Sequence, residues 1–154
     1  MKTQENNPGD WFLLAGERLR SVDALRRSEG ITYSCVELLQ ESVERYLKGY
    51  LIAQGWKLEY IHDLNRLLDT AAVYDTRFNT YASLAQSLTE QFSAQHYPGD
   101  ELDDVGSDYD ELRQQADELI ELIRCELPQY FQLPASDEHI STDNSCDTQG
   151  PTKA

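Results

Sequence analysis

The sequence predicts an all-α protein, most simply an up-down bundle of about five helices. Apolar residues recur at spacings of three and four along five segments, which is the period of an α-helix. No segment alternates apolar and polar residues as a half-buried strand does. Residues that cap or break helices stand where the periodic segments begin and end: Pro8, Gly30, Gly55 and Pro128.

The first helix is expected over residues 8–29, with Asn7 as its N-cap and Gly30 as its stop. Pro8 fits the first helical position, where its missing N–H costs nothing. A second helix is expected after Thr32, with Ser34 and Glu37 as a capping box. The core-facing residues of the first are predicted to be Trp11, Leu14, Ala15, Leu19, Val22 and Leu25, and those of the second Val36, Leu39, Val43, Leu47, Tyr50 and Leu51.

Three further helices are expected. The third covers about residues 58–73 and has no strong cap at its start. The fourth runs from about residue 75 to 94 and ends before Tyr97-Pro98-Gly99, which is typical of a turn. Residues 100–106 are then expected to form an acidic loop, and Ser107 to cap an acidic last helix that ends before Pro128. The inner face of that helix is predicted to be Leu112, Ala116, Leu119, Ile120 and Ile123.

Length and composition indicate one helical domain. The chain has 154 residues, of which 40% are hydrophobic and 27% charged. We expect the domain to cover residues 8–134, with a flexible N-terminus over 1–7 and a disordered polar tail over 135–154. No stretch approaches the roughly 20 apolar residues that span a bilayer, and the N-terminus has no apolar core of a secretory signal. A cytoplasmic protein without membrane contact is therefore expected.

The charge of −15 is unevenly distributed. Residues 1–57 hold eight bases and eight acids, whereas residues 100–126 hold eleven acids and only two bases. This field repels a phosphate backbone, so duplex DNA is not an expected partner. An acidic protein more often meets a basic protein surface.

The cysteines and histidines predict neither a disulfide framework nor a metal site. Cys35, Cys125 and Cys146 are odd in number and include no Cys-x-x-Cys pair, and Cys35 and Cys125 lie in apolar helical patterns as buried residues would. This usage indicates a reducing compartment. His62, His96 and His139 have no second histidine at helical spacing, and no cofactor motif is present.

One ordered set of residues is more specific. The chain opens with Asp10-Trp11, continues with Gln40, Glu44, Leu47 and Lys48 on one helix, then His62-Asp63-Leu64, and later Tyr97-Pro98. This series resembles the HEPN family of small helical proteins over about residues 8–128. Arg45 stands where the family has Lys, Gly49 where it has Ala, and His96 where it has Arg.

The resemblance implies a helical bundle that forms a homodimer and often accompanies a minimal nucleotidyltransferase in toxin–antitoxin-like systems. Many members also resemble metal-independent ribonucleases that use an Arg followed by a His, with four to six residues between them. None of the three histidines here has an Arg in that register. Lys57, with four residues between it and His62, is the nearest imitation, and it offers a point charge instead of a planar fork.

Three functions therefore stay open. The first is a non-catalytic interaction module, whose contacts with a nucleotide or partner would use Arg45, Lys48, His62, Asp63, His96 and Tyr97. The second is an endoribonuclease toxin with an atypical site of His62, Lys57 and Arg45 across a dimer interface. The third is a nucleotide-binding protein with a groove around Arg45, Lys48 and His62.

Purely structural roles are also open for the same residues. Arg45 and Lys48 can form helix-surface ion pairs with Glu41 and Glu44. His62 and Asp63 can cap a helix or contact the second helix. Tyr97-Pro98 can be a turn with a buried ring.

Overall fold

A computed structural model describes residues 1–95 and 105–131, without the side chains of 105–107. The described residues contain no strand, and the predicted all-α fold is confirmed. The predicted polar tail over 135–154 lies outside them, as do His96, Tyr97 and residues 100–104 of the predicted acidic loop. The helices are α1 (Pro8–Glu29), α2 (Tyr33–Ala53), α3 (Leu64–Tyr74), η1 (Thr76–Tyr81), α4 (Ala82–Gln95), α5 (Val105–Glu126) and η2 (Pro128–Tyr130).

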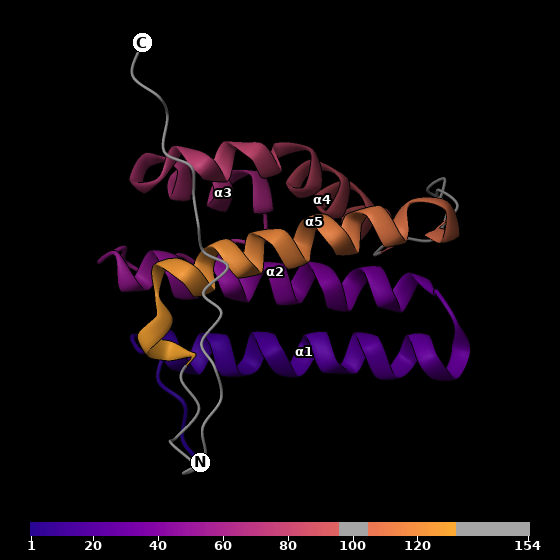
Figure 1. The fold of residues 1–154 in the computed structure, drawn as a ribbon, viewed down its shortest axis with the longest axis horizontal. Coiled ribbons are helices and arrows are strands. Elements are labelled where there is room, and N and C mark those ends of the chain that lie inside the picture. The colour runs from indigo at the N-terminus through magenta and orange to yellow at the C-terminus, as the bar shows by residue number, and fades with distance from the viewer. Residues whose placement is uncertain (96–104, 132–154) are drawn as a thin grey trace, which may run out of the picture.

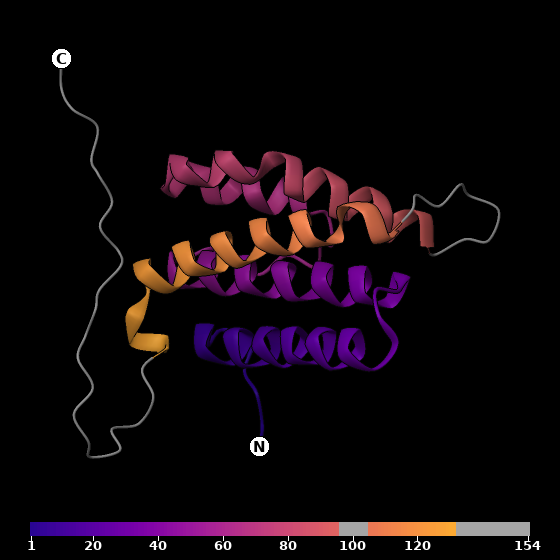
Figure 2. The ribbon, with the colours of Figure 1, turned by 45° about the vertical axis from the view of Figure 1, so that its right-hand side comes forward.

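The centre of the bundle is α2. It forms an antiparallel hairpin with α1, and it packs against α3, α4 and α5 as well (Figure 1). The turned view separates α1 on one side of α2 from α3 and α4 on the other, with α5 running along the hairpin (Figure 2). All six apolar residues predicted for the core face of this helix are buried: Val36, Leu39, Val43, Leu47, Tyr50 and Leu51.

The bounds of α1 are those predicted from its caps. The Asn7 Oδ1 accepts a hydrogen bond from the backbone N–H of Gly9 at 3.1 Å, and Gly30 ends the helix with a φ of 81°. The predicted core face was wrong in part, because Phe12 is buried while Leu14 is exposed and Trp11 only half-buried. The backbone of α1 lies close to α2 and η2 alone among the described elements, and α5 reaches it only through side-chain contacts, so a narrow stripe of α1 is covered.

Gly49 of α2 explains how Phe12 fits. A Cβ at Gly49 would lie 2.6 to 3.0 Å from three atoms of the Phe12 ring, so only glycine leaves room for the ring there. The ring of Phe12 then packs against Tyr46, Tyr130 and Phe131, with centroid separations of 6.0, 5.7 and 4.7 Å. This aromatic cluster joins the start of α1 to η2.

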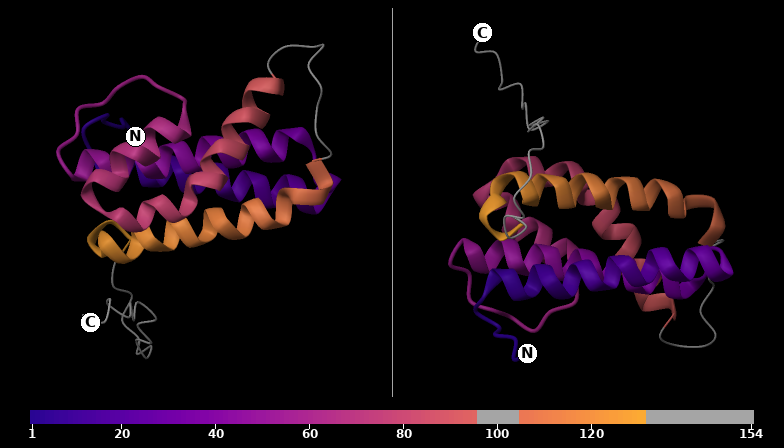
Figure 3. Two further views of the ribbon diagram at one scale, coloured as in Figure 1. Left: turned by 90° about the horizontal axis from the view of Figure 1, so that it is seen from above. Right: turned by 60° about the horizontal axis from the view of Figure 1, so that its bottom comes forward.

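The second helix begins after Thr32 as predicted, but its predicted capping box and the predicted start of the third helix were wrong. The N-cap of α2 is Thr32, and Ser34 lies inside the helix instead of capping it with Glu37. The third helix begins at Leu64 instead of residue 58, and its cap is Asp63, whose Oδ1 accepts from the backbone N–H of Asn65 at 2.9 Å. Residues 58–63 are not helical and form part of the connection that swings outward near the N-terminus (Figure 3).

The last two predicted helices also differ in detail. The segment expected as one helix over 75–94 is a 3-10 helix, η1, capped by Asp75 and followed directly by α4. The last helix is already formed at Val105, so Ser107 does not cap it. Its predicted inner face is confirmed, because Leu112, Ala116, Leu119, Ile120 and Ile123 are all buried.

The N-terminal segment, residues 1–7, follows the surface of the bundle. The backbone N–H of Gln4 donates to the Asp10 Oδ2 at 2.9 Å, and the Trp11 indole N–H donates to the Glu5 carbonyl at 2.8 Å. The hydroxyl of Tyr60 donates to the Glu5 carboxylate at 2.9 Å. The flexibility expected of this segment stays a prediction. Across the part of the chain that is described, no helix is long and apolar enough to cross a membrane.

Candidate functional site

Three polar side chains are buried in a row on α2. Gln40, Glu44 and Lys48 are spaced four residues apart, so they lie on one face of the helix, one turn above another. Only 9% of the Glu44 side chain and 4% of the Lys48 side chain are exposed, and Gln40 is fully buried. Charged groups are rarely buried to this extent unless they are paired.

Glu44 is the centre of the row. Lys48 Nζ donates to Glu44 Oε1 at 2.6 Å, and Gln40 Nε2 donates to Glu44 Oε2 at 3.3 Å. His62 Nδ1 lies 3.1 and 3.2 Å from the same two oxygens. An ionised carboxylate only accepts, so Nδ1 carries the proton in this contact. One carboxylate therefore serves a cation, an amide and an imidazole.

His62 reaches Glu44 from the connection between α2 and α3. Gln40 Nε2 donates to the backbone carbonyl of His62 at 3.1 Å, which holds the connection against α2. Asp63 then caps α3, as described above. The structure thus brings both residues into the two structural roles that the sequence left open for them: a helix cap and a polar contact to the second helix. The imidazole itself is 71% exposed.

The far side of the Lys48 ammonium faces Trp11. The Nζ atom lies 5.7 Å from the centroid of the indole ring, within the range of a cation–π contact. Trp11 in turn is held by its hydrogen bond to Glu5. A carboxylate and an aromatic face together enclose the charge of Lys48.

Arg45 is not part of this row. Its Nη1 donates to the Glu41 carboxylate and to the Glu41 carbonyl, both at 3.1 Å. Arg18 of α1 donates to the same carboxylate through Nε at 2.7 Å. Lys57 is exposed in the connection after α2. Of the predicted site residues, the structure therefore joins Lys48 to His62, through Glu44, and places Arg45 in a separate ion pair with Glu41.

Two further ion-pair clusters stabilise the bundle away from this row. Arg113 of α5 donates to Asp23 of α1 at 2.5 Å and to Asp117 at 2.9 Å. Arg77 of η1 donates to Asp75 at 2.6 Å and also to Glu126 of α5. The hydrogen bonds from Arg77 hold the pKa of the Asp75 carboxyl below its usual value. These clusters connect α5 to both sides of the bundle.

The row offers little open binding capacity. The amide oxygen of Gln40 is buried and has no hydrogen-bond partner, whereas the Glu44 carboxylate accepts from three groups. Among the described side chains, no three His, Cys, Asp or Glu residues gather in a way that would hold a metal ion. Of the groups that contact Glu44, the imidazole of His62 is the exposed one.

Sequence reasoning identified Glu44, Lys48 and His62 but not what joins them. The spacing predicted an ion pair on the helix surface, and the structure buries that pair. Gln40 was noted only as part of a family pattern, although it holds both Glu44 and the His62 carbonyl. The sequence did contain an indication of this role, because Gln40 stands one turn before Glu44 and next to Leu39, a residue predicted for the core and buried in the structure.

Comparison with known proteins gives one finding. The sequence model of a protein family described as "HEPN domain" matches residues 9–126. A search of curated proteins and a search of solved structures each found no match.

Proposed function

The chain belongs to the HEPN domain family, and from that premise we propose that it is a non-catalytic interaction module. It forms a homodimer and binds a second protein. By the resemblance set out above, the partner is a minimal nucleotidyltransferase, and the two proteins form a toxin–antitoxin-like system.

One observation carries the proposal: the basic side chains at the candidate site are already used inside the protein. Binding or cleaving a phosphodiester needs cations that face the ligand. Lys48 is buried against Glu44, and Arg45 is paired with Glu41. Freeing Lys48 would leave the buried Glu44 carboxylate without its cation, which is costly, whereas Glu41 would keep its ion pair with Arg18. This supports a structural role for both cations.

The outer surface supports binding to protein. Leu13 of α1 is exposed, and so is Leu14, which lies beside residues 3–5. Exposed acids on α5, among them Asp108, Glu111 and Glu118, add to an overall charge of −15. An apolar helix face suits a second copy of the chain, and the acidic surface suits a basic partner.

Light scattering and co-purification test the proposal. On a sizing column the chain is expected at twice its mass of 17.6 kDa, and it should co-elute with the product of a neighbouring nucleotidyltransferase gene after co-expression. A monomer that elutes alone from that co-expression contradicts the proposal. Calorimetric titration with ATP and GTP is expected to give no heat at millimolar ligand, and saturable heat would favour the nucleotide-binding function instead.

One observation favours a ribonuclease as the second candidate. Because Nδ1 of His62 faces the Glu44 carboxylate, Nε2 is the ring nitrogen left for a ligand, as in a histidine that a carboxylate orients for acid–base catalysis. No arginine side chain of the described residues has a hydrogen bond or ion pair with His62. RNA cleavage in EDTA that is lost on His62→Ala would establish this function. Intact RNA at micromolar protein would remove it.

A further inference from the structure

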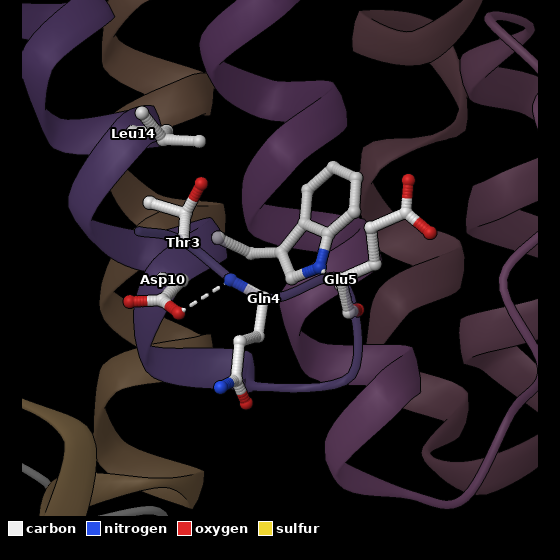
Figure 4. A pocket seen from close by; sticks show the side chains of 6 residues that line it. Thr3, Gln4, Glu5, Asp10 and Leu14 are labelled. Atoms are coloured by element: carbon white, nitrogen blue, oxygen red, sulfur yellow. Dashed lines mark hydrogen bonds between the residues drawn. The ribbon is translucent and has the colours of Figure 1, made fainter. Parts of the chain in front are cut away.

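The N-terminal segment, residues 1–7, is bound to the bundle through groups that many other peptides also carry. Trp11 donates to a backbone carbonyl, that of Glu5, and Asp10 accepts from a backbone N–H, that of Gln4. Figure 4 shows the second of these bonds as a dashed line. Tyr60 donates to a carboxylate, that of Glu5, at 2.9 and 3.0 Å. The bundle thus binds the backbone of a short turn, closed by a hydrogen bond from the Asn7 N–H to the Gln4 carbonyl, and one acidic side chain.

Two shallow apolar hollows flank Glu5. One, of about 130 Å³, is lined by Asp10, Trp11 and Leu14 together with residues 3–5 (Figure 4). The other, of about 190 Å³, is lined by Ile52, Trp56 and Leu58 together with Glu5 and Asn6. The segment does not fill either of them. The surface beneath it therefore has room for a peptide with larger side chains than its own.

We propose that this surface, formed by Trp11, Leu14, Ile52, Trp56, Leu58 and Tyr60, is a docking site for a short turn-forming segment of a partner protein that carries one carboxylate. Residues 1–6 occupy the site in cis and are displaced when the partner binds, while Asn7 stays in place as the N-cap of α1. The inference rests on the proposed interaction function and names the surface through which the partner is held.

The bonds that hold the cis segment are suited to displacement. All three are exposed hydrogen bonds, which are individually weak in water. The charge of the partner segment is also constrained. The cis segment contains one lysine and one glutamate, and a chain of charge −15 repels long acidic peptides. The fitting occupant is a neutral or basic segment with a single Glu or Asp.

Fluorescence reports on this site directly, because Trp11 and Trp56 are the only two tryptophans of the chain and each lines one hollow. The experiment uses the full chain with Glu5→Gln, which weakens the cis contact to Tyr60. A synthetic peptide with the wild-type sequence of residues 1–6 is added, and a second peptide carries the same Glu5→Gln change. Glu17→Gln, an exposed change on α1, is the matched control protein.

The wild-type peptide is expected to shift the indole emission of the Glu5→Gln protein saturably. It should bind about fivefold more tightly than the substituted peptide, the factor that one hydrogen bond of ordinary strength supplies. In the Glu17→Gln protein, whose cis segment is intact, binding should be weaker by a similar factor. Adding Tyr60→Phe to the Glu5→Gln chain should abolish the preference between the two peptides.

Three results overturn the proposal: no saturable shift at millimolar peptide, equal binding of the two peptides, or equal binding to both proteins. The tests of the two proposals separate. If the peptide binds but no partner co-purifies, the result supports the docking site and contradicts the proposed function. If a partner co-purifies equally with wild type and Tyr60→Phe, the partner is held elsewhere and the docking site falls.

Discussion

Replacing Lys48 with methionine tests whether the ion pair at the centre of the site is structural. Methionine keeps most of the length of the side chain and removes its charge. Only 9% of the Glu44 side chain is exposed in the wild-type protein, and without Lys48 its carboxylate would keep Gln40 and His62 as hydrogen-bond donors. Removing one partner of a buried pair costs about 3–5 kcal/mol, because the other charge is left uncompensated. Against a total stability of roughly 5–15 kcal/mol, this loss is readily measured.

The double variant E44Q/K48M shows where that cost comes from. With both charges removed, no buried ion is left alone, so the double variant should be more stable than Lys48→Met by about 2 kcal/mol or more. Arg66→Met is the matched control. It removes an ion pair of similar length, 2.8 Å to Glu59, whose side chains are 60% and 47% exposed. We expect that change to cost under about 1 kcal/mol.

Urea unfolding at neutral pH, followed by circular dichroism at the helix band, gives all four free energies. If the free energy of unfolding of Lys48→Met lies within about 1 kcal/mol of the wild-type value, as we expect for Arg66→Met, the Lys48 ammonium does not stabilise the fold as a buried ion pair would. Lys48 would then be available to an anion, and the observation that carries the proposed function would be lost. A large loss that E44Q does not restore would instead point to packing of the lysine stem against Trp11.

Three further predictions concern packing and pH. Gly49→Ala should destabilise the protein by about 1–3 kcal/mol despite the better helix propensity of alanine, because the new Cβ meets the Phe12 ring; an unchanged or higher melting temperature contradicts this. The pKa of Asp75 is lowered by its hydrogen bonds from Arg77. The stability that this carboxylate adds is therefore fully present above the pKa of Asp75 in the unfolded chain, and it is lost as the pH falls through the pKa in the folded protein. The stability difference between wild type and Arg77→Met should therefore shrink between neutral pH and about pH 2.5 in urea titrations, and a constant difference refutes it. Burial raises the pKa of Tyr50 to about 12, so the stability that its neutral phenol adds is lost as the pH rises from the ordinary pKa near 10 through 12. Over that range the Tyr50→Phe variant should lose less stability than the Tyr74→Phe variant. Equal losses in the two variants would exclude Tyr50 as the cause.

The sequence predicted elements well where their signals are local. Asn7, Pro8 and Gly30 set both ends of α1 through contacts within a few residues, and the predicted bounds agree with the structure. Most of α2 was predictable for a related reason. Its apolar stripe is wide, and a helix surrounded by neighbours buries all of it.

The prediction failed where a distant contact decides the conformation. Leu58 and Ile61 continue the helical period into α3, so residues 58–63 were expected to be helical. In the structure, Gln40 binds the carbonyl of His62, and Glu5 binds the hydroxyl of Tyr60. Gln40 and Glu5 are both far from residues 58–63 in sequence, and no local pattern predicts these contacts. The burial of Lys48 could not be predicted for the same reason, because its cover comes from Trp11 of another helix.

These distant contacts link the docking surface to the Glu44 row. Lys48 faces Trp11, Trp11 binds Glu5, and Glu5 binds Tyr60. Tyr60 stands two residues before His62, which returns to Glu44. If a partner's carboxylate replaced that of Glu5, Tyr60 would keep an acceptor and the connection after α2 would keep its anchor. His62 would then stay on Glu44 and Lys48 under Trp11, with or without a partner. Exchange of one segment for another would then leave Lys48 enclosed between Glu44 and Trp11, as the proposed interaction function requires.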